Sequence, residues 1–334
     1  MQSMSDLPHV LVIGCGSIGE RHLRCFLNTG RCRAAVCDTN GRLVAEVAAR
    51  YGVNGYDSLE AASVFPATAW VICTPAHTHL ALTRRGLEAG MNVLIEKPLA
   101  TGLDGVAAVR AAMAAHPACH VAVAYVFHAM PWLQEMRRAL LSGDFGRPRH
   151  ASLVAGQHFP TFRPAYRDIY YARHESGGGA IQDALTHSVN AMEWLLGPTT
   201  RVYCDAAHQV LEGVEVEDTV NIAARHGGVL ASYCYNQFQA PNELELRVHA
   251  ERGSLAMEVH RQRWGWMRHG DADWTWQPTP AERDDLFTWQ AGAFLDGCAG
   301  LPSPLASFED GVQTLKFNLA ALESVRTGRP VEIA

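Results

Sequence analysis

The sequence predicts an α/β protein, with a doubly wound N-terminal domain followed by an α+β domain that contains a mostly antiparallel open sheet. Three observations support this prediction. Strand-like and helical segments alternate over the first third of the chain, a glycine-rich turn follows the first strand, and strand-like runs follow one another after residue 200. The 334 residues, 48% of them apolar and 19% charged, suffice for two ordinary globular domains.

Five short apolar segments, rich in β-branched residues, predict the strands of the first sheet. Helical patterns separate them, and this alternation is typical of a parallel sheet with helices on both faces. Thr101 and Asp104 resemble a capping box, so a helix is expected from Leu103 to the proline after His116. The expected strands are His9–Ile13, Ala34–Cys37, Ala69–Cys73, Asn92–Glu96 and His120–Ala124.

The pattern changes after about residue 125, so we expect one domain at 1–125 and a second at 126–334. In the second domain, helices are expected near Met130–Ser142, Gly179–Leu196, Glu282–Cys298 and Phe308–Arg326. The spacing of the strand-like runs between them fits an antiparallel meander. These runs are Arg201–Ala206, Thr219–Ala224, Val229–Asn236, Leu244–Ala250 and Ser254–Glu258.

The composition argues against several classes of function. The formal net charge is −6, so no net cationic field attracts the protein to nucleic acid or to anionic lipid. The first residues lack the pattern of a secretory signal, and no run of about 18 apolar residues suggests a membrane span. Nine cysteines without C-x-x-C spacing predict reduced thiols and no metal site. We therefore expect a cytoplasmic protein that binds neither nucleic acid nor membrane.

The segment after the first strand predicts a dinucleotide site. Gly14, Gly16 and Gly19 form a G-x-G-x-x-G pattern that leads into a helix. In a Rossmann domain, these glycines allow a tight turn, the approach of a pyrophosphate, and close packing of helix on strand. The helix N-terminus favours an anion. Ser17 and Ile18, in the same loop, are also expected to contact the cofactor.

The ends of the next strands extend this site. Asp38 can accept hydrogen bonds from both ribose hydroxyls and would repel a 2′-phosphate, which favours NAD over NADP. A solvated turn residue is the alternative for Asp38. Thr74, Pro75 and His79 are expected to line the cofactor, because ligands of doubly wound sheets lie at the carboxyl ends of the strands. With no third ligand nearby, His77 and His79 do not predict a metal site.

The strand after that ends in Glu96, Lys97 and Pro98, which places a lysine where the nicotinamide is expected. An ammonium at this point stabilises the alkoxide that develops on a secondary hydroxyl while a hydride leaves. Glu96 and Lys97 are therefore also counted as cofactor contacts. The alternative is an exposed lysine at a strand end with its ammonium in water.

Asp183 and His187 lie four residues apart in an expected helix and would share one face, with Asn190 a turn further on. A neutral histidine can receive the hydroxyl proton, and a carboxylate can hold the substrate or orient the imidazole. The alternative is a capping acid beside a hydrogen-bonded core histidine. The residues of this helix expected to face the core are Ile181, Leu185, Met192 and Leu195.

Taken together, these motifs resemble the Gfo/Idh/MocA family, named for glucose-fructose oxidoreductase, inositol dehydrogenase and a rhizopine catabolism protein. The resemblance covers nearly the whole chain and includes the glycine run at 177–179 and the ending Gly328-Arg-Pro330. It implies an NAD(P)-dependent oxidoreductase of sugars, polyols or their derivatives. It also implies that Lys97, Asp183 and His187 are catalytic and that a cis peptide bond precedes Pro98.

Further residues are expected to contact the substrate. Arg163 and Arg167 lie in a segment that resembles a Trp-Arg-Pro…Tyr-Arg loop of one branch of the family, and they could bind a carboxylate or phosphate. Pairing with internal acids is the alternative for both arginines. Tyr125 is another expected contact, and so is Asn190, where the family often has Asp.

Four tryptophans flank the turn-like segment at 269–271. A hairpin would place their indoles on one face, as an oligomer interface or as a platform for a sugar. An open sheet usually needs covering, so we expect a homo-oligomer that forms through it. The four residues are Trp264, Trp266, Trp274 and Trp276.

The expected function is reversible hydride transfer between NAD and a secondary hydroxyl of a carbohydrate bound between the domains. One alternative is a glycosidase or lyase that keeps NAD bound and uses transient oxidation. A second is a sensor that binds NAD without chemistry. The sequence leaves open which substrate is used, which carbon is oxidised and in which direction.

Overall fold

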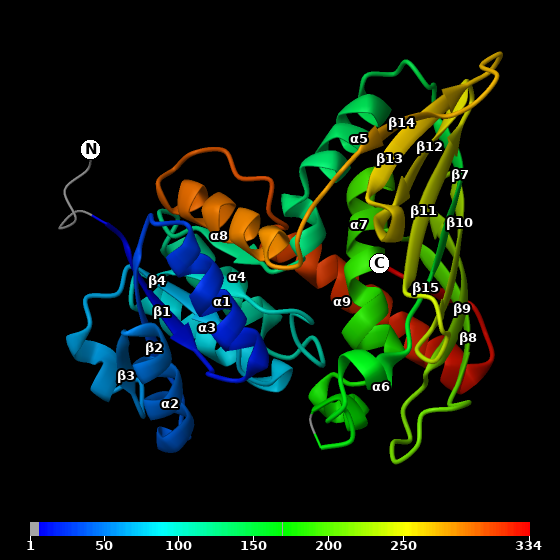
Figure 1. Ribbon diagram of the computed structural model, residues 1–334. Coiled ribbons are helices and arrows are strands. Elements are labelled where there is room, and N and C mark those ends of the chain that lie inside the picture. Colours follow the sequence, from blue (N-terminus) through cyan, green and yellow to red (C-terminus); the bar gives the residue numbers. More distant parts are fainter. Residues whose placement is uncertain (1–6, 169) are drawn as a thin grey trace. The chain divides into compact units, whose positions relative to one another are not determined.

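The structure is a computed structural model that describes residues 7–168 and 170–334 (Figure 1). It divides into two compact units. The first contains the chain up to Ala129 together with Glu282–Glu309, and the second contains Met130–Ala281 together with Asp310–Ala334. The sequence suggested one division after residue 125, whereas here a late segment returns to the first unit. Its helix α8 (Asp285–Cys298) packs on α1 (Ser17–Asn28).

The first unit contains a six-stranded parallel sheet in the order β3-β2-β1-β4-β5-β6. The chain moves outward from β1 in both directions, and such a switch point is where doubly wound sheets bind their ligands. The five predicted strands are confirmed, and β3 was missed because it is three residues long and has no apolar run. The strands are β1 (His9–Ile13), β2 (Arg33–Cys37), β3 (Asn54–Tyr56), β4 (Ala69–Ile72), β5 (Asn92–Ile95) and β6 (Val121–Val123).

The helices of this sheet are α1, α2 (Gly41–Tyr51), α3 (His79–Glu88) and α4 (Val106–Ala115). The predicted start of α4 at Leu103 is wrong. Gly105 precedes the helix with a φ of 92°, in the left-handed region, and no side chain caps the first turn. Thr101 and Asp104 therefore do not form a capping box for α4.

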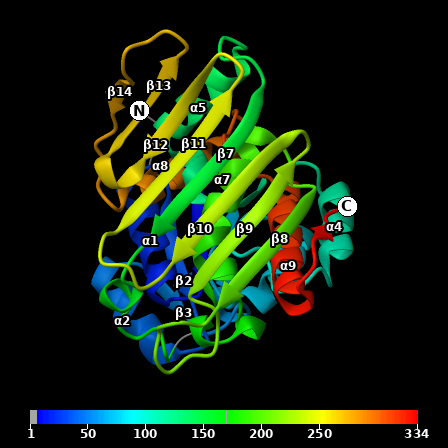
Figure 2. The ribbon, with the colours of Figure 1, turned by 90° about the vertical axis from the view of Figure 1, so that its right-hand side faces the viewer.

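The second unit contains a nine-stranded sheet in the order β14-β13-β12-β11-β7-β10-β9-β8-β15, seen face-on in Figure 2. Neighbouring strands are antiparallel except β7 and β10, which run parallel. The sequence missed β7, although β7 lies in the middle of the sheet. The strands are β7 (Pro148–Gly156), β8 (Arg201–Ala207), β9 (Thr219–His226), β10 (Val229–Asn236), β11 (Glu243–Ala250), β12 (Gly253–Glu258), β13 (Arg263–Arg268), β14 (Thr275–Pro278) and β15 (Val331–Glu332).

Helices cover one face of this sheet, and Figure 2 shows α7 and α9 behind the strands. Along β9 and β10, buried and exposed residues alternate, so the other face presents its side chains outward. The helices of the unit are α5 (Pro131–Leu141), α6 (Phe159–Phe162), α7 (Thr186–Leu196) and α9 (Phe308–Thr327). Short 3₁₀ turns of the chain lie at Ala61–Val64, Ala76–Thr78, Val126–Ala129, Tyr170–Ala172, His174–Ser176 and Val259–Arg261.

The single helix predicted at Gly179–Leu196 is two elements. A π-helical turn, Ala180–Leu185, leads into α7. Asp183 therefore lies in the wider turn and His187 in the regular helix. The prediction that both lie on one face of a single α-helix is wrong, because the two residues belong to helices of different pitch. The four residues expected in the core, Ile181, Leu185, Met192 and Leu195, are all buried.

The tryptophans of β13 (Trp264 and Trp266) and of β14 (Trp276) do not share one face, which corrects the prediction; Trp274 lies just before β14. Gly265 pairs with Trp276, and Trp264 pairs with Gln277, so the indoles of the two strands alternate out of phase. The Trp264 indole N–H donates to Glu135 of α5 at 3.0 Å. On the other face, the Arg263 guanidinium lies 3.9 Å from the ring centre of Trp276. Local period-two spacing cannot determine this relative register.

Over the described ranges, no helix combines the length and the apolar character needed to cross a lipid bilayer.

Candidate active site

The glycine-rich loop has the shape required for a dinucleotide. A Cβ on Gly14 would lie 2.6 Å from the Cys73 carbonyl oxygen, and a Cβ on Gly19 would lie 1.8 Å from the Gly14 carbonyl oxygen. Both glycines are thus needed for the close packing of β1, α1 and the end of β4. A Cβ on Gly16 would meet no atom within 4 Å. The missing side chain at Gly16 serves no internal contact and leaves room for a ligand.

The N-terminus of α1 begins beside this space. Gly16 is its N-cap, and no side chain caps the first turn. The first N–H groups of an α-helix have no partner within the helix, so those that follow Gly16, at Ser17 and Ile18, suit a pyrophosphate. The chain therefore fits the cofactor that its motif predicts.

Asp38 follows β2 and joins it to the loop. One carboxylate oxygen accepts the Cys15 N–H at 2.7 Å, and the other accepts the Asn40 N–H at 2.9 Å. A carboxylate oxygen can accept two hydrogen bonds, so each retains capacity for a ribose hydroxyl. The pairing of Ile13 with Cys37 sets Asp38 level with the start of the loop.

Lys97 lies at the same edge of the sheet as the glycine loop. Strands β1, β4 and β5 are parallel neighbours, so the residues after them meet at one edge. Two strand spacings separate β1 from β5, which is about 10 Å. The peptide bond between Lys97 and Pro98 is cis, as the family resemblance implied.

The side chain of Glu96 is turned inward and is 5% exposed. One carboxylate oxygen lies 2.6 Å from Nε2 of His22 in α1, and the other accepts the Lys97 N–H at 3.0 Å. His22 was not predicted for the site, because nothing in the spacing of α1 distinguishes it from an ordinary core histidine.

His79, a predicted cofactor contact, is 1% exposed. Its Nε2 lies 2.7 Å from the Thr74 carbonyl oxygen and its Nδ1 lies 3.1 Å from the Pro98 carbonyl oxygen. Burial lowers the pKa of His79. The ring thus joins the ends of β4 and β5. Next to it, the Thr74 and Thr78 hydroxyls lie 2.6 Å apart, and Pro75 begins the 3₁₀ turn that leads into α3.

Asp183 lies in the second unit and is 7% exposed. The Tyr170 hydroxyl donates to its Oδ1 at 2.7 Å. The π-helical turn that carries Asp183 is anchored by Glu217, whose Oε1 accepts the Ile181 N–H at 2.8 Å and whose carbonyl oxygen accepts the Ala180 N–H at 3.0 Å. Neither Tyr170 nor Glu217 was among the predicted site residues.

The same Glu217 explains part of the glycine run. A Cβ on Gly179 would lie 2.6 Å from Glu217 Oε1, and Gly179 has a φ of 91°, so both space and conformation require glycine. His174 Nε2 lies 2.5 Å from Glu217 Oε2, and this hydrogen bond raises the pKa of His174. The carboxylate therefore fixes the turn before Asp183 from two sides.

His187 lies in the first turn of α7 and is partly exposed, whereas Asn190 is 1% exposed. The Asn190 amide donates to the Thr314 hydroxyl at 3.0 Å, which directs it toward α9. That hydroxyl donates in turn to Glu193 at 2.7 Å, and burial raises the pKa of Glu193 to about 7. The role of Asn190 in substrate binding stays a prediction.

The other predicted substrate contacts differ in their surroundings. Arg167 donates to the Glu212 carbonyl oxygen at 2.8 Å and lies 3.4 Å from the carboxylate of Glu212. This is the pairing with an acid of the chain that was the alternative to substrate binding for Arg167. Arg163 is partly exposed. Tyr125 is fully buried. The predicted contacts of all three with a substrate remain predictions.

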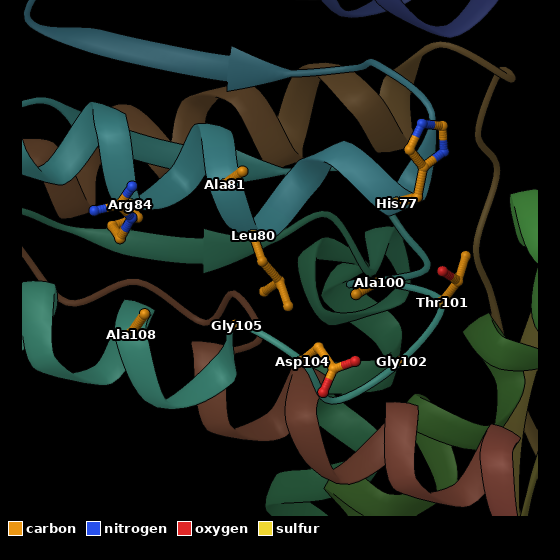
Figure 3. Close-up of a pocket in the computed structure, with 10 residues that line it drawn as sticks. All are labelled: His77, Leu80, Ala81, Arg84, Ala100, Thr101, Gly102, Asp104, Gly105 and Ala108. Carbon is orange, nitrogen blue, oxygen red and sulfur yellow. The ribbon is translucent and has the colours of Figure 1, made fainter.

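A cavity of about 470 Å³ opens between α3 and α4 in the first unit (Figure 3). His77, Arg84 and Asp104 are among its lining residues. None of the residues predicted for cofactor or catalysis lines it, so this cavity is separate from the candidate site. Across residues 7–168 and 170–334, no three His, Cys, Asp or Glu side chains gather in a way that could hold a metal ion.

Two family profiles match the chain. One, described as an oxidoreductase family with an NAD-binding Rossmann fold, matches residues 9–125, and the other, the Gfo/Idh/MocA C-terminal domain, matches residues 133–256. The chain is 29% identical to 1,5-anhydro-D-fructose reductase of Ensifer adhaerens over 272 residues, 78% of either chain. It is 29% identical to inositol 2-dehydrogenase of Burkholderia vietnamiensis over 199 residues, 56% of this chain and 53% of the relative.

The fold is also similar to that of solved structures. Levoglucosan dehydrogenase in complex with NADH and levoglucosan superposes with a TM-score of 0.87 at 20% identity, covering 98% of this chain and 100% of that one. At this identity the likeness concerns the fold alone.

Proposed function

Because this chain belongs to the Gfo/Idh/MocA family of oxidoreductases with an NAD-binding Rossmann fold, we propose that it transfers a hydride between NAD and a secondary hydroxyl of a sugar, polyol or sugar derivative. The observation that carries the proposal is Lys97, which follows β5 at the edge where the glycine loop follows β1. The names of its relatives, an anhydrofructose reductase and an inositol dehydrogenase, support this class of substrate.

NAD, when bound, supplies the hydride acceptor, and the protein manages the proton and the charge. The Lys97 ammonium donates a hydrogen bond to the substrate hydroxyl and stabilises the negative charge that develops on its oxygen. His187 accepts the hydroxyl proton in oxidation and returns it in reduction. Asp183, whose carboxylate is held by Tyr170, orients the imidazole or the substrate.

The lysine content of the chain makes this role easy to test. Lys97 and Lys316 are its two lysines, against 26 arginines. Lys316 lies on α9 and contacts the Ala334 carbonyl oxygen. A Lys97→Ala variant should bind NADH and lose turnover, whereas Lys316→Ala should keep both. Near-native turnover of Lys97→Ala would refute the assignment.

To identify the substrate, the protein is incubated with NAD and each compound of a panel of sugars, anhydrosugars, inositols, uronic acids and nucleotide sugars. Formation of NADH is followed by its absorbance. Formation of NADH together with an oxidised sugar supports the proposed dehydrogenase. Cleavage or elimination of the sugar with no net change in NADH would instead identify transient oxidation. Binding of NADH without turnover of any compound would favour a sensor.

We further propose that a second copy of the chain covers the outward face of the nine-stranded sheet. Val154, Tyr203 and Leu230 on this face are 50%, 45% and 49% exposed, and Tyr203 and Leu230 line a hollow of about 310 Å³. Apolar side chains exposed together in this way favour association. Leu230→Arg should reduce the mass measured by light scattering, whereas Leu141→Arg, at an exposed position on α5, should leave it unchanged.

We also propose that the enzyme is cytoplasmic, and its nine free cysteines, an odd number that cannot all pair within one chain, support this proposal. Fractionation of the native cells, with the protein detected by antibody, tests this expectation.

A further inference from the structure

Lys97 lies in a segment without regular secondary structure. Strand β5 ends at Ile95, α4 begins at Val106, and no helix or strand lies between them in the described residues. The position of the Lys97 backbone therefore depends on contacts with neighbouring elements. Leu99 and Ala100, which follow Pro98, are buried, so the segment is anchored beyond the lysine.

One such contact comes from α1, the helix that begins at the glycine loop. Its His22 is 1% exposed, and Nε2 lies 2.6 Å from one oxygen of Glu96. The other oxygen of Glu96 accepts the Lys97 N–H. The carboxylate thus links a side chain of the phosphate-binding helix directly to the backbone of the catalytic lysine. Phe287 of α8 packs edge-on against the His22 ring, with ring centres 5.5 Å apart.

A second contact comes from α3. The His79 ring lies between the carbonyl oxygens of Thr74 and Pro98, at 2.7 and 3.1 Å. A neutral imidazole carries one N–H, so it donates to one of these carbonyls while contacting the other. The ring spans the gap between Thr74, the second residue after β4, and Pro98, the residue after Lys97.

We propose that His22, acting through Glu96, and His79 are positioning residues that fix the Lys97 turn relative to the cofactor loop. Each histidine holds one side of the Lys97–Pro98 peptide unit: Glu96 bonds the N–H before it, and His79 contacts the carbonyl after it. Neither ring needs to touch cofactor or substrate for this role. The inference rests on the proposed function of Lys97 and deepens it.

The chemistry at His22 predicts a graded response to substitution. In His22→Gln, the amide nitrogen can still reach Glu96 as a donor, whereas His22→Leu leaves a buried carboxylate without that partner. A displacement of a catalytic group by about 1 Å can lower the rate about a hundredfold. We expect His22→Leu to lose about a hundredfold in kcat and His22→Gln to recover most of it. KM for the sugar and the Kd for NADH should change far less than kcat in both variants.

A readout without turnover comes from chemical labelling of the two lysines. Acetic anhydride is applied with and without NADH, and the labelled peptides are measured by mass spectrometry. In the native protein, NADH should slow labelling of Lys97 and leave that of Lys316 unchanged. In His22→Leu and in His79→Leu, NADH should still bind, measured by calorimetry, but should no longer slow labelling of Lys97 to the native extent.

A buried histidine of the second unit provides the control. His226 is 2% exposed and hydrogen-bonds Gly197 and Tyr233, so His226→Gln perturbs the core to a similar degree without involving the Lys97 turn. It should lower the midpoint of thermal unfolding and leave kcat and labelling of Lys97 native. Native kcat and native protection in folded His22→Leu and His79→Leu would overturn the inference. If no sugar is turned over by the native protein, the proposed function fails, while the labelling experiment still decides whether these histidines position Lys97.

Discussion

The buried acid Glu193 provides a quantitative test of the structure. It lies on α7 and is 8% exposed, and it accepts hydrogen bonds from the Thr314 hydroxyl at 2.7 Å and the Gln313 amide at 3.2 Å. These bonds favour the charged form, but burial outweighs them and raises the pKa of Glu193 from 4.5 to about 7.

This difference in pKa fixes both the sign and the size of the effect on stability. The folded state binds the proton of Glu193 more tightly than the unfolded state. The contribution of Glu193 to the free energy of unfolding is therefore fully present below pH 4.5, is lost as the pH rises toward about 7, and does not change further above that pH. A difference from 4.5 to about 7 corresponds to a loss of about 3 kcal/mol.

Glu193→Gln removes the ionisation and keeps an amide oxygen that can accept from Thr314. At pH 8 the variant should be more stable than the native protein by up to about 3 kcal/mol, reduced by about 1 kcal/mol for any hydrogen bond that the amide makes less well. At pH 4 the two proteins should differ little.

The assay is urea unfolding followed by circular dichroism at a series of pH values, with native and variant proteins compared at each pH. Glu323→Gln, in another helix of the same unit, is the control. Glu323 is partly exposed on α9, and its hydrogen bond with Arg326 lowers its pKa, so its replacement should change stability only slightly and in the opposite sense. Parallel pH profiles for Glu193→Gln and the native protein would refute the reasoning.

Four other substitutions test the site. Gly16→Ala should abolish NADH binding, measured by calorimetry, without lowering the midpoint of thermal unfolding, because its Cβ meets only open space within the protein. Gly19→Ala should lower the free energy of unfolding in urea by about 1–3 kcal/mol, because its Cβ meets the Gly14 carbonyl. A lower thermal midpoint for Gly16→Ala would contradict the view that Gly16 serves the ligand and not the packing. Asp38→Ser should shift the ratio of kcat/KM toward NADP, and an unchanged ratio would exclude the ribose contact. Tyr170→Phe should lower kcat about tenfold while the Kd for NADH stays native, and an unaltered kcat would remove Tyr170 from the support of Asp183.

The parts of the fold that could be predicted are those with a local signal. Strands β1, β4 and β5 are buried apart from the first residue of β1 and of β5, so they appear in the sequence as nearly continuous apolar runs. Strand β7 begins at a proline, ends at a glycine and carries polar residues on its outward face, and these features resemble a loop. Only its pairing with β10 and β11, both more than 70 residues further along the chain, shows that it belongs to the centre of the sheet.

The same distinction applies to the site. The glycine loop, Asp38 and Lys97 could be predicted as site residues because each follows a recognisable strand. His22, by contrast, is connected to the site only by its contact with Glu96, which is 74 residues away in the sequence. The hydrogen bond between Glu217 and Ile181 likewise joins residues that are 36 positions apart. A single sequence contains these residues but not their pairing.

Residues that support the site, such as His22 and Glu217, are therefore recognised in a different way from residues that are proposed to react, such as Lys97. A reacting group is recognised by its chemistry and by its place after a strand, whereas a supporting group is recognised only when burial would otherwise leave a polar atom without a partner. Glu96 illustrates this point, because a carboxylate 5% exposed requires a donor from somewhere in the fold. Once β5 is placed beside β4, and β4 beside β1, helix α1 is the element that packs next to them, and His22 is its buried side chain with a donor to offer. The pairing then follows from the requirement that the buried charge be satisfied, and it is the basis of the proposed role of His22 in positioning Lys97.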